Sequence, residues 1–255
     1  VPSGKNFIYF DYSQLELRIF AILSKDSEML KLYEENKDIH LITTSIFLDI
    51  PENQVIEFNR QEVGKKFNFG IVFGSEGFRL VKSGIWRDKN NIDKPITWDI
   101  LNKGMARWRA KFPNAAQYLT NVPVLTRSNN GVWINPFGLE KHVGEKLNSS
   151  NEGERKASER ELVNSTIQSP AAQIVKRTLS ILHEIILDKV EKGMLKDDDI
   201  FQLLTIHDSG GYECAEYLTP WWCSVIKQVS ERPIPELGGA SFPVSIGIGK
   251  SWSDA

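Results

Sequence analysis

Two aspartates, Asp11 and Asp208, stand where the sequence predicts that β-strands end. The apolar, β-prone run 7–10 leads directly into Asp11, and Asp208 lies in a tight turn between two β-prone segments, 200–206 and 210–214. A sheet that presents both carboxylates at one edge can hold a pair of Mg²⁺ ions, which is the arrangement for in-line phosphoryl transfer. An aspartate at a strand end also commonly caps a helix or forms a turn, so this pair alone is not specific.

A second group consists of Lys65, Phe69 and Phe73, which are spaced four residues apart within a predicted helix. This spacing places an ammonium group and two aromatic rings on one helix face. Such a face suits a nucleoside triphosphate, because Lys65 can meet phosphate charge while Phe69 packs on the sugar and base. A buried aromatic stripe with a lysine that reaches solvent is the alternative.

A third group, Arg160, Asn164 and Gln168, has the same four-residue spacing in a long predicted helix. Amide and guanidinium donors on one face suit the minor-groove acceptors that all base pairs share, so they can contact a duplex without sequence preference. A solvated polar stripe has the same pattern.

Around these groups the sequence resembles the DNA polymerase I family, the family A DNA polymerases. The segment 11–18, DYSQLELR, resembles the first catalytic motif of that family, and 64–74, GKKFNFGIVFG, resembles the second. The triplet 207–209, HDS, resembles the third, and 164–168, NSTIQ, resembles a segment that contacts the duplex beside the active site. The resemblance covers essentially the whole chain.

The resemblance implies a DNA-directed DNA polymerase that adds dNTPs to a primer 3′-hydroxyl by two-metal phosphoryl transfer. Asp11 and Asp208 would bind two Mg²⁺ ions, for which Mn²⁺ can substitute, and the main-chain carbonyl of Tyr12 would add a ligand. Tyr12, Ser13 and Gln14 are then expected beside the nucleotide. Primer-template DNA and dNTPs are the implied partners.

The resemblance also assigns roles to Glu16, His40 and His207. Glu16 would pack beneath the incoming sugar and exclude a 2′-hydroxyl, although Phe73 lacks the hydroxyl with which a tyrosine often holds this glutamate. His40 would lie near the nucleotide phosphates, and His207 near the primer terminus. A solvated glutamate, an ordinary helix histidine and a packed turn histidine are the respective alternatives.

Two positions depart from the family pattern. Gln61 stands four residues before Lys65, where the family usually has a phosphate-binding arginine, and Arg60 is one residue earlier, about 100° around an ideal helix. Either the helix is overwound or underwound here, the register differs by one, or Arg60 reaches around. Ser209 replaces the acidic residue that often follows the third-motif aspartate, so two aspartates must suffice for the metals.

The pattern of apolar positions predicts several helices and one hairpin. Helices are expected at 14–23, 27–35, 38–47, 54–72 and 154–192, the last with a break near Ser169-Pro170, and a hairpin is expected at 131–138. We expect an α+β fold in which a mainly helical fingers subdomain, 26–130, is inserted into a palm of antiparallel strands formed by 1–25 and 131–255. The thumb and any 3′-5′ exonuclease domain of such an enzyme are expected upstream of Val1.

The composition is that of a globular chain rather than a disordered one, with 41% hydrophobic residues and a formal net charge of −2 over 255 residues. Positive charge is concentrated between residues 60 and 111, where twelve Lys/Arg face five Asp/Glu. The basic and aromatic stretch 82–111 suits a single-strand template path or a solvated surface. Two cysteines without metal-ligand spacing favour an intracellular setting, and no apolar run suggests a membrane span.

Two other functions remain open at this point. A single-subunit RNA polymerase would share the palm and the helix face, but the context of Glu16 argues against it. A non-catalytic, polymerase-derived DNA-binding module is disfavoured by the presence of Asp11, Lys65 and Asp208. The source could be viral, phage-like or organellar, and we expect a monomer.

Overall fold

The computed structural model describes residues 1–72 and 78–254, and the chain divides into two compact units. Unit 1 is discontinuous and consists of Val1–Leu15 and Ser169–Ala255, whereas unit 2 is the continuous stretch Glu16–Gln168. The chain passes between the units within helix α1 (Leu15–Ser24) and within helix α9 (Glu152–Glu191). Among the described residues, no helix combines the length and the apolar character that a membrane crossing requires.

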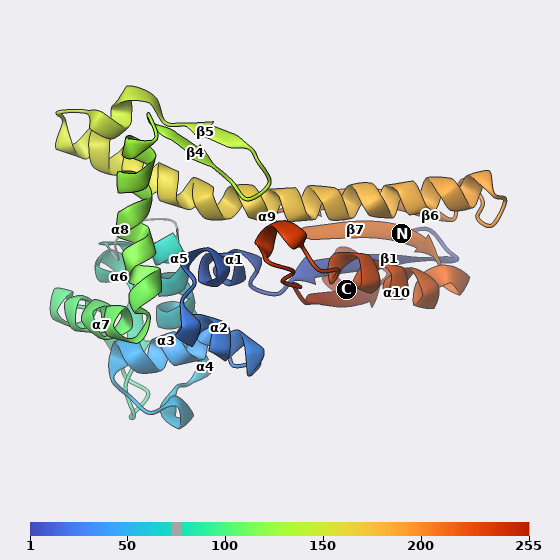
Figure 1. The fold of residues 1–255 in the computed structure, drawn as a ribbon. Coiled ribbons are helices and arrows are strands. Elements are labelled where there is room, and N and C mark those ends of the chain that lie inside the picture. The colour runs from blue at the N-terminus through green and yellow to red at the C-terminus, as the bar shows by residue number, and fades with distance from the viewer. Residues whose placement is uncertain (73–77, 255) are drawn as a thin grey trace. The chain divides into compact units, whose positions relative to one another are not determined.

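Unit 1 is built on an antiparallel sheet of four strands in the order β6-β7-β1-β8 (Figure 1). The strands are β1 (Lys5–Tyr12), β6 (Ile200–Ile206), β7 (Ser209–Ala215) and β8 (Val244–Gly249). Unit 1 also contains the part of α9 from residue 169 on, helix α10 (Thr219–Ser230) and the short 3₁₀ turns η4 (Glu216–Leu218), η5 (Pro235–Leu237) and η6 (Trp252–Asp254). The strands expected at 7–10, 200–206 and 210–214 are therefore confirmed.

One face of this sheet forms the core of unit 1. Side chains alternate between the faces of a strand, and the even-numbered residues Ile8, Phe10 and Tyr12 of β1 are all at most 1% exposed. The Phe10 ring stacks on Tyr212, which meets Trp222 of α10 edge to face. Asp11, being odd-numbered, belongs to the opposite face.

Unit 2 is mainly helical and contains two small hairpins. Besides its parts of α1 and α9, its helices are α2 (Ser27–Glu34), α3 (Ile39–Leu48), α4 (Glu57–Asn59), α5 (Lys66–Val72), α6 (Phe78–Ser83), α7 (Trp98–Lys111) and α8 (Pro113–Ser128). The unit also contains the 3₁₀ turns η1 (Glu52–Gln54) and η3 (Gly144–Asn148) and the π-helix η2 (Arg60–Lys65). Its hairpin strands are β2 (Ile85–Arg87), β3 (Asp93–Pro95), β4 (Val132–Ile134) and β5 (Glu140–His142). The helices expected at 14–23, 27–35 and 38–47 are confirmed as α1, α2 and α3, and the expected hairpin is confirmed as the pair β4 and β5.

Aromatic packing forms the main core of unit 2. Phe47 of α3 lies 4.7 Å from Phe67 of α5, measured between ring centroids, and Phe67 lies 6.1 Å from Trp108 of α7. Trp108 in turn meets Phe112, and all four rings are at most 2% exposed. A second cluster of buried Val122, Leu147, Leu162 and Val163 joins α8, η3 and α9.

Two helix predictions need correction. The helix expected at 54–72 is interrupted, because η1 and an extended stretch come first and η2 is a π-helix between α4 and α5. The break expected near Ser169-Pro170 is absent, because α9 is one continuous helix of 40 residues that includes Pro170. Proline removes one backbone donor, but Ile167 and Ile174 on either side of it are fully buried, and this packing outweighs one missing hydrogen bond. The subdomain boundaries at 25/26 and 130/131 stay predictions.

Candidate functional site

In unit 1 the backbone brings Asp11 and Asp208 together at one end of the sheet. Asp11 pairs with Ser209 in the β1–β7 register, so Asp208 directly precedes the residue opposite Asp11. The main-chain carbonyl of Asp208 accepts a hydrogen bond of 3.1 Å from the amide of Tyr12. Two carboxylate-bearing residues from distant parts of the chain thus lie on neighbouring strand ends, and both are partly exposed.

The turn that carries Asp208 is short and braced. Ile206 pairs with Ser209, which leaves His207 and Asp208 as a two-residue hairpin loop, and His207 has a φ of 52°. A positive φ is uncommon for a residue with a side chain, although histidine tolerates it better than most. The Ser209 hydroxyl donates to the carbonyl of Ile206 at 2.5 Å, so this side chain is used to hold the turn. Among the described residues, no group of three or more His, Cys, Asp or Glu is placed so that it could hold a metal ion.

Tyr12 can contribute to a site only through its main chain. Its hydroxyl is within 2.8 Å of Thr178 Oγ1 and donates to the carbonyl of Ser230 at 3.1 Å, which ties the ring to α9 and α10. Burial raises the pKa of this phenol, opposed by the two hydrogen bonds. The following residue, Ser13, is exposed, and its amide donates to the carbonyl of Pro243 at 2.9 Å.

Gln14 and Glu16 lie where the chain turns from β1 into α1. Gln14 has a φ of 55°, and its side-chain oxygen is buried without a hydrogen-bond partner among the described residues. An unsatisfied buried acceptor is uncommon in a native structure and suits a position beside a ligand. Glu16 is partly exposed in the first turn of α1, where the helix dipole favours a negative charge.

In unit 2, the π-helix η2 accounts for the position of Arg60. A π turn brings residues i and i+5 one turn apart, whereas an α turn does so for i and i+4. Arg60 and Lys65 are the first and last residues of η2, so they lie on one side of the helix despite their five-residue separation. Underwinding is thus the explanation, among those the sequence left open, that the structure supports. Gln61 instead donates to Glu57 at 2.6 Å.

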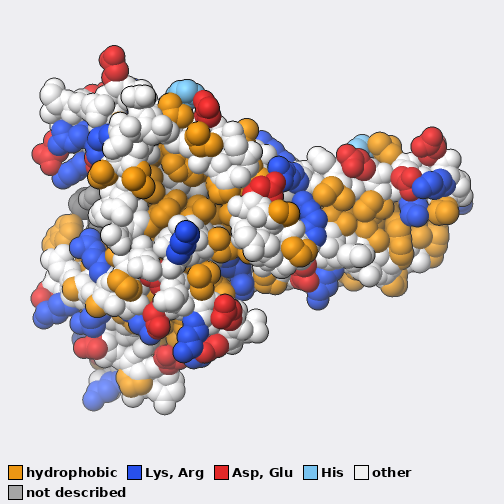
Figure 2. Space-filling model, viewed as in Figure 1, with side chains coloured by type: hydrophobic (Ala, Val, Ile, Leu, Met, Phe, Trp, Pro, Cys, Tyr) orange, Lys and Arg blue, Asp and Glu red, His pale blue; other side chains and the backbone are white. Residues whose placement is uncertain are grey.

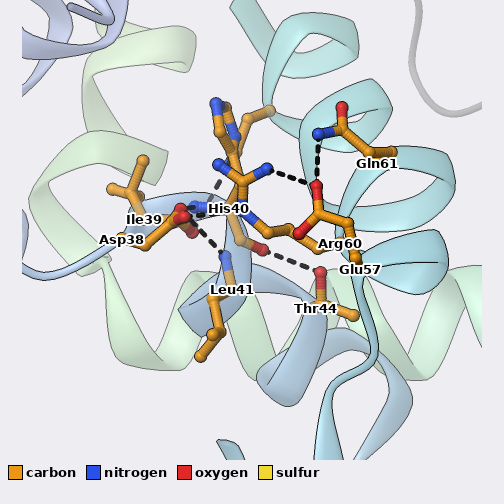
Figure 3. Close-up of polar contacts among 9 residues, drawn as sticks. Asp38, Ile39, His40, Leu41, Thr44, Glu57, Arg60 and Gln61 are labelled. Atoms are coloured by element: carbon orange, nitrogen blue, oxygen red, sulfur yellow. Dashed lines mark hydrogen bonds and ion pairs between the residues drawn. The ribbon is translucent and has the colours of Figure 1, made fainter.

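Arg60, Asp38 and His40 are linked where η2 meets α3 (Figure 3). The Asp38 carboxylate caps α3 by accepting from the amides of His40 and Leu41, and it accepts from Arg60 Nε at 2.5 Å. Burial opposes the ionisation of Asp38, but the Arg60 hydrogen bond and the two amides prevail and lower its pKa. Gly64 permits this close approach, since a Cβ there would lie 2.1 Å from the carbonyl oxygen of His40.

His40, Lys65 and Phe69 lie close together around this link. The rings of His40 and Phe69 are 6.0 Å apart between centroids, and His40 is 4% exposed. Burial lowers the pKa of His40 to about 4; Asp38 opposes this change, and Arg60 and Lys65 support it. Lys65 is exposed, and its ammonium has no hydrogen bond or ion pair to any residue that the structure describes. Phe73, the last member of this group, falls outside the described residues.

On α9, the residues Arg160, Asn164 and Gln168 share one face, as the spacing predicted, because the helix is regular across them. Gln168 is exposed, and Arg160 and Asn164 are partly exposed. The side-chain oxygen of Asn164 is buried and has no hydrogen-bond partner in the described part of the chain. The packed cluster of Leu162 and Val163 occupies another face.

The basic stretch 82–111 is largely committed to contacts within unit 2. Trp108 belongs to the core, Arg107 donates to the carbonyls of Ile46 and Phe47, and Arg87 pairs with Asp93. Lys and Arg side chains are also interspersed with Asp and Glu on the face shown in Figure 2. These contacts favour the structural interpretation of this stretch over a template path.

Sequence reasoning missed two residues of the group around His40. Asp38 was only the first residue of the helix expected at 38–47, and its carboxylate proves to join the helix cap to Arg60. Asn68, inside the second motif, is 2% exposed and contacts the imidazole of His40 at 3.0 Å. A buried amide within an aromatic run was the available signal, since such a group needs hydrogen-bond partners.

Comparisons with known proteins agree on one family. Residues 1–254 match the model of "DNA polymerase family A". DNA polymerase I of Pseudomonas aeruginosa is 28% identical over 260 residues, which cover 100% of this chain and 25% of that protein. DNA polymerase I of Borreliella burgdorferi is 32% identical over 207 residues, covering 81% of this chain and 20% of that protein. The chain thus spans about a quarter of the length of these relatives.

A solved structure shows the same fold. The POL domain of Pol1 from M. smegmatis, in complex with a DNA primer-template and dNTP, matches with a TM-score of 0.79 at 24% sequence identity. The match covers 100% of this chain and 41% of that one. The α+β fold expected from the sequence is thereby confirmed.

Proposed function

Because the chain belongs to DNA polymerase family A, we propose that it provides the palm and fingers of a DNA-directed DNA polymerase. The proposed reaction is attack of a primer 3′-hydroxyl on the α-phosphate of a dNTP, which extends the primer and releases pyrophosphate. The observation that carries this proposal is the convergence of Asp11 and Asp208 on neighbouring strand ends. The proposed partners are primer-template DNA and dNTPs, and the proposed location of the reaction is inside the cell.

The oxygen donors of unit 1 fit hard divalent cations. Asp11, Asp208 and the main-chain carbonyl of Tyr12 would hold two Mg²⁺ ions or Mn²⁺ in their place, since such cations prefer carboxylate and carbonyl oxygens. When bound, the two ions lower the pKa of the attacking hydroxyl and stabilise the leaving oxygens. The braced turn of His207 and Ser209 supports this role, because it fixes the backbone beside one of the two carboxylates.

The residues of unit 2 around η2 would bind the nucleotide. Lys65 has no competing partner among the described residues and would neutralise phosphate charge. Arg60, on the same side of η2, would release the Asp38 carboxylate and bind a phosphate in its place. Phe69 would pack on the sugar and base, and Phe73 on the same nucleotide. His40 would donate a hydrogen bond to a phosphate oxygen.

The remaining residues would select the nucleotide and contact DNA. Ser13, Gln14 and Glu16 would line the nucleotide, with Glu16 excluding a 2′-hydroxyl. Arg160, Asn164 and Gln168 would contact the minor groove through the shared acceptors of all base pairs. His207 would contact the primer terminus. The buried, unsatisfied oxygens of Gln14 and Asn164 support positions beside a ligand.

Primer extension by the protein that contains this chain tests the proposal. With Mg²⁺ and dNTPs, we expect Asp208→Asn to reduce the rate by about a hundredfold or more. The matched control is Asp197→Asn, an exposed aspartate of the same unit that should leave the rate unchanged. Equal rates for wild type and Asp208→Asn would refute the metal assignment. A preference for NTPs would indicate an RNA polymerase, and absence of extension by the wild type a non-catalytic module.

A further inference from the structure

Asn68 is a buried amide with a defined partner for each end of its side chain. Its oxygen accepts a hydrogen bond of 3.0 Å from the hydroxyl of Thr43. Its nitrogen lies 3.0 Å from Nδ1 of His40 and 3.5 Å from the carbonyl oxygen of Ile39. All three partners belong to the region of α3, so the second motif reaches back to this helix through one side chain.

The surroundings determine which end of the amide faces the histidine. The carbonyl oxygen of Ile39 is only an acceptor, so the nitrogen of Asn68, rather than its oxygen, must lie beside it. An amide nitrogen is only a donor, so the neighbouring Nδ1 of His40 must accept and cannot carry a proton. The proton of the neutral imidazole is then on Nε2.

Burial acts against a second proton on the imidazole, and the positive charges of Arg60 and Lys65 add to this effect, whereas Asp38 opposes it. Asp38, Arg60 and Lys65 are the groups that act on it electrostatically, and Glu57 acts indirectly by pairing with Arg60. The Asp38 carboxylate is occupied by two backbone amides and by Arg60, so it does not offer the ring an ion pair. Protonation at Nδ1 would also point a proton at the NH₂ group of Asn68.

We propose that Asn68 is a positioning residue that holds His40 in the Nε2–H tautomer, so that the ring presents one neutral donor to a phosphate oxygen of the nucleotide. The nucleotide part of this inference rests on the proposed function. The tautomer matters because phosphate oxygens are acceptors. The lone pair that Nε2 would present in the opposite tautomer would repel them, whereas Nε2–H binds them.

The tautomer can be measured without nucleotide or DNA. We expect two-bond ¹H–¹⁵N correlation spectra of the unliganded protein at neutral pH to show His40 with a protonated Nε2 and an unprotonated Nδ1. A protonated Nδ1 would mean that the amide is reversed, and would overturn the inference whether or not the protein extends primers. This readout separates failure of the inference from failure of the proposed function.

Two variants test the role of the amide. Asn68→Asp replaces the donor beside Nδ1 by a carboxylate, so the pKa of His40 should rise by roughly one to three units. A pKa that stays at its wild-type value would overturn the inference. Thr43→Val removes the hydrogen bond to the other end of the amide and should leave the tautomer unchanged. A switch to Nδ1–H in this control would show that Thr43, rather than the Ile39 carbonyl, orients the amide, and would support the amide as the group that sets the tautomer.

Kinetics test the nucleotide part. In Asn68→Asp, KM for dNTP should become pH-dependent between about pH 5 and 7, where His40 now titrates, while wild-type KM stays flat over that range. Asn68→Leu, which removes the constraint on the ring, should raise KM by roughly tenfold with a smaller change in kcat. A KM that is unaffected in both folded variants would refute the link between the tautomer and nucleotide binding.

Discussion

Lys65 and Lys66 are neighbours in the chain, yet their side chains have different surroundings. Lys66 pairs with Glu62 at 2.5 Å on the exposed surface, one helical turn away. The ammonium of Lys65 has no such partner within the described residues, and its charge acts on the buried ring of His40. An unpaired lysine beside a buried ring and an arginine is available to an anionic ligand, whereas a paired one is not.

This difference predicts unequal effects of two alanine substitutions. Lys65→Ala should weaken dNTP binding by roughly ten- to a hundredfold, because a charge-assisted contact with phosphate is lost. Lys66→Ala should change it by less than about twofold, since an exposed ion pair contributes little. Titration of each variant with a fluorescent dNTP measures both values. Equal losses would show that only the overall charge matters.

His40 should make the protein sensitive to acid. In the folded protein its pKa is lowered from 6.5 to about 4, so between these values the unfolded chain binds more protons. The free energy of unfolding should therefore decrease as the pH falls through this window, by up to roughly 3 kcal/mol from this residue. Urea unfolding of wild type and His40→Gln at several pH values measures the contribution.

The comparison has a matched control on the surface. His142 is exposed and lies 2.9 Å from Glu140, and His142→Gln is measured in the same assay as the surface substitution. His40→Gln should show a shallower slope between pH 6.5 and 4, whatever its stability at neutral pH. If both variants keep the wild-type slope, His40 is not the group that resists protonation.

At the scale of elements, η2 has the geometry of a one-residue insertion into a helix. The π turn accommodates one extra residue between Arg60 and Lys65. The segments before and after it are therefore rotated relative to each other as they would be in a regular α-helix that is one residue shorter. Gln61 is a suitable extra residue, because the only hydrogen bond of its side chain in the described structure is to Glu57 in the preceding turn.

Deletion of Gln61 should therefore be tolerated. It leaves Arg60 four residues before the lysine, where an ordinary α-helix places both on one face, and the melting temperature should stay within about 5 °C of wild type. Deletion of exposed Lys103 from α7 is the control, since it rotates buried Leu101 relative to Trp108 by about 100° and should destabilise severely. Thermal unfolding followed by circular dichroism measures both. Comparable losses would mean that η2 is not a simple insertion.

The sequence predicted the elements whose signals are local. An apolar run ending in Asp11 and two runs flanking the turn at Asp208 were sufficient to place both carboxylates on one sheet. The π-helix could not be predicted, because a slip of one residue changes the period of a helical pattern too little to detect. The continuity of α9 was missed for a different reason: the burial of the residues that keep the chain helical through Pro170 depends on tertiary packing.

Asn68 shows a further limit of the sequence. Its partner His40 is 28 residues away, and the orientation of an amide depends on atoms such as the carbonyl oxygen of Ile39. No spacing rule carries that information. The motif could identify the helix face of Lys65 and Phe69, but the hydrogen bonds beneath that face required the structure.

At the scale of the whole molecule, the two units differ in how the chain builds them. Unit 2 is continuous from Glu16 to Gln168 and contains its own aromatic core. Unit 1 needs both ends of the chain, because β1 lies between β7 and β8 and comes from the N-terminal segment. A single excised fragment can fold alone only if it contains its own core, and the stretch Glu16–Gln168 meets that condition.

Two fragments test this difference. The fragment 16–168 should fold alone, with a helical circular dichroism spectrum, one cooperative thermal transition and the Nε2–H signature of His40. The fragment 169–255 lacks β1, so β8 loses the strand with which it pairs and Phe10 no longer covers Tyr212. A two-stranded hairpin is at best marginally stable in water, so this fragment should show no cooperative transition unless a peptide of residues 1–15 is added. Cooperative folding of 169–255 alone would show that the core of unit 1, next to the turn that carries Asp208, forms without β1. Absence of structure in 16–168 would show that the core of unit 2 depends on the rest of the chain.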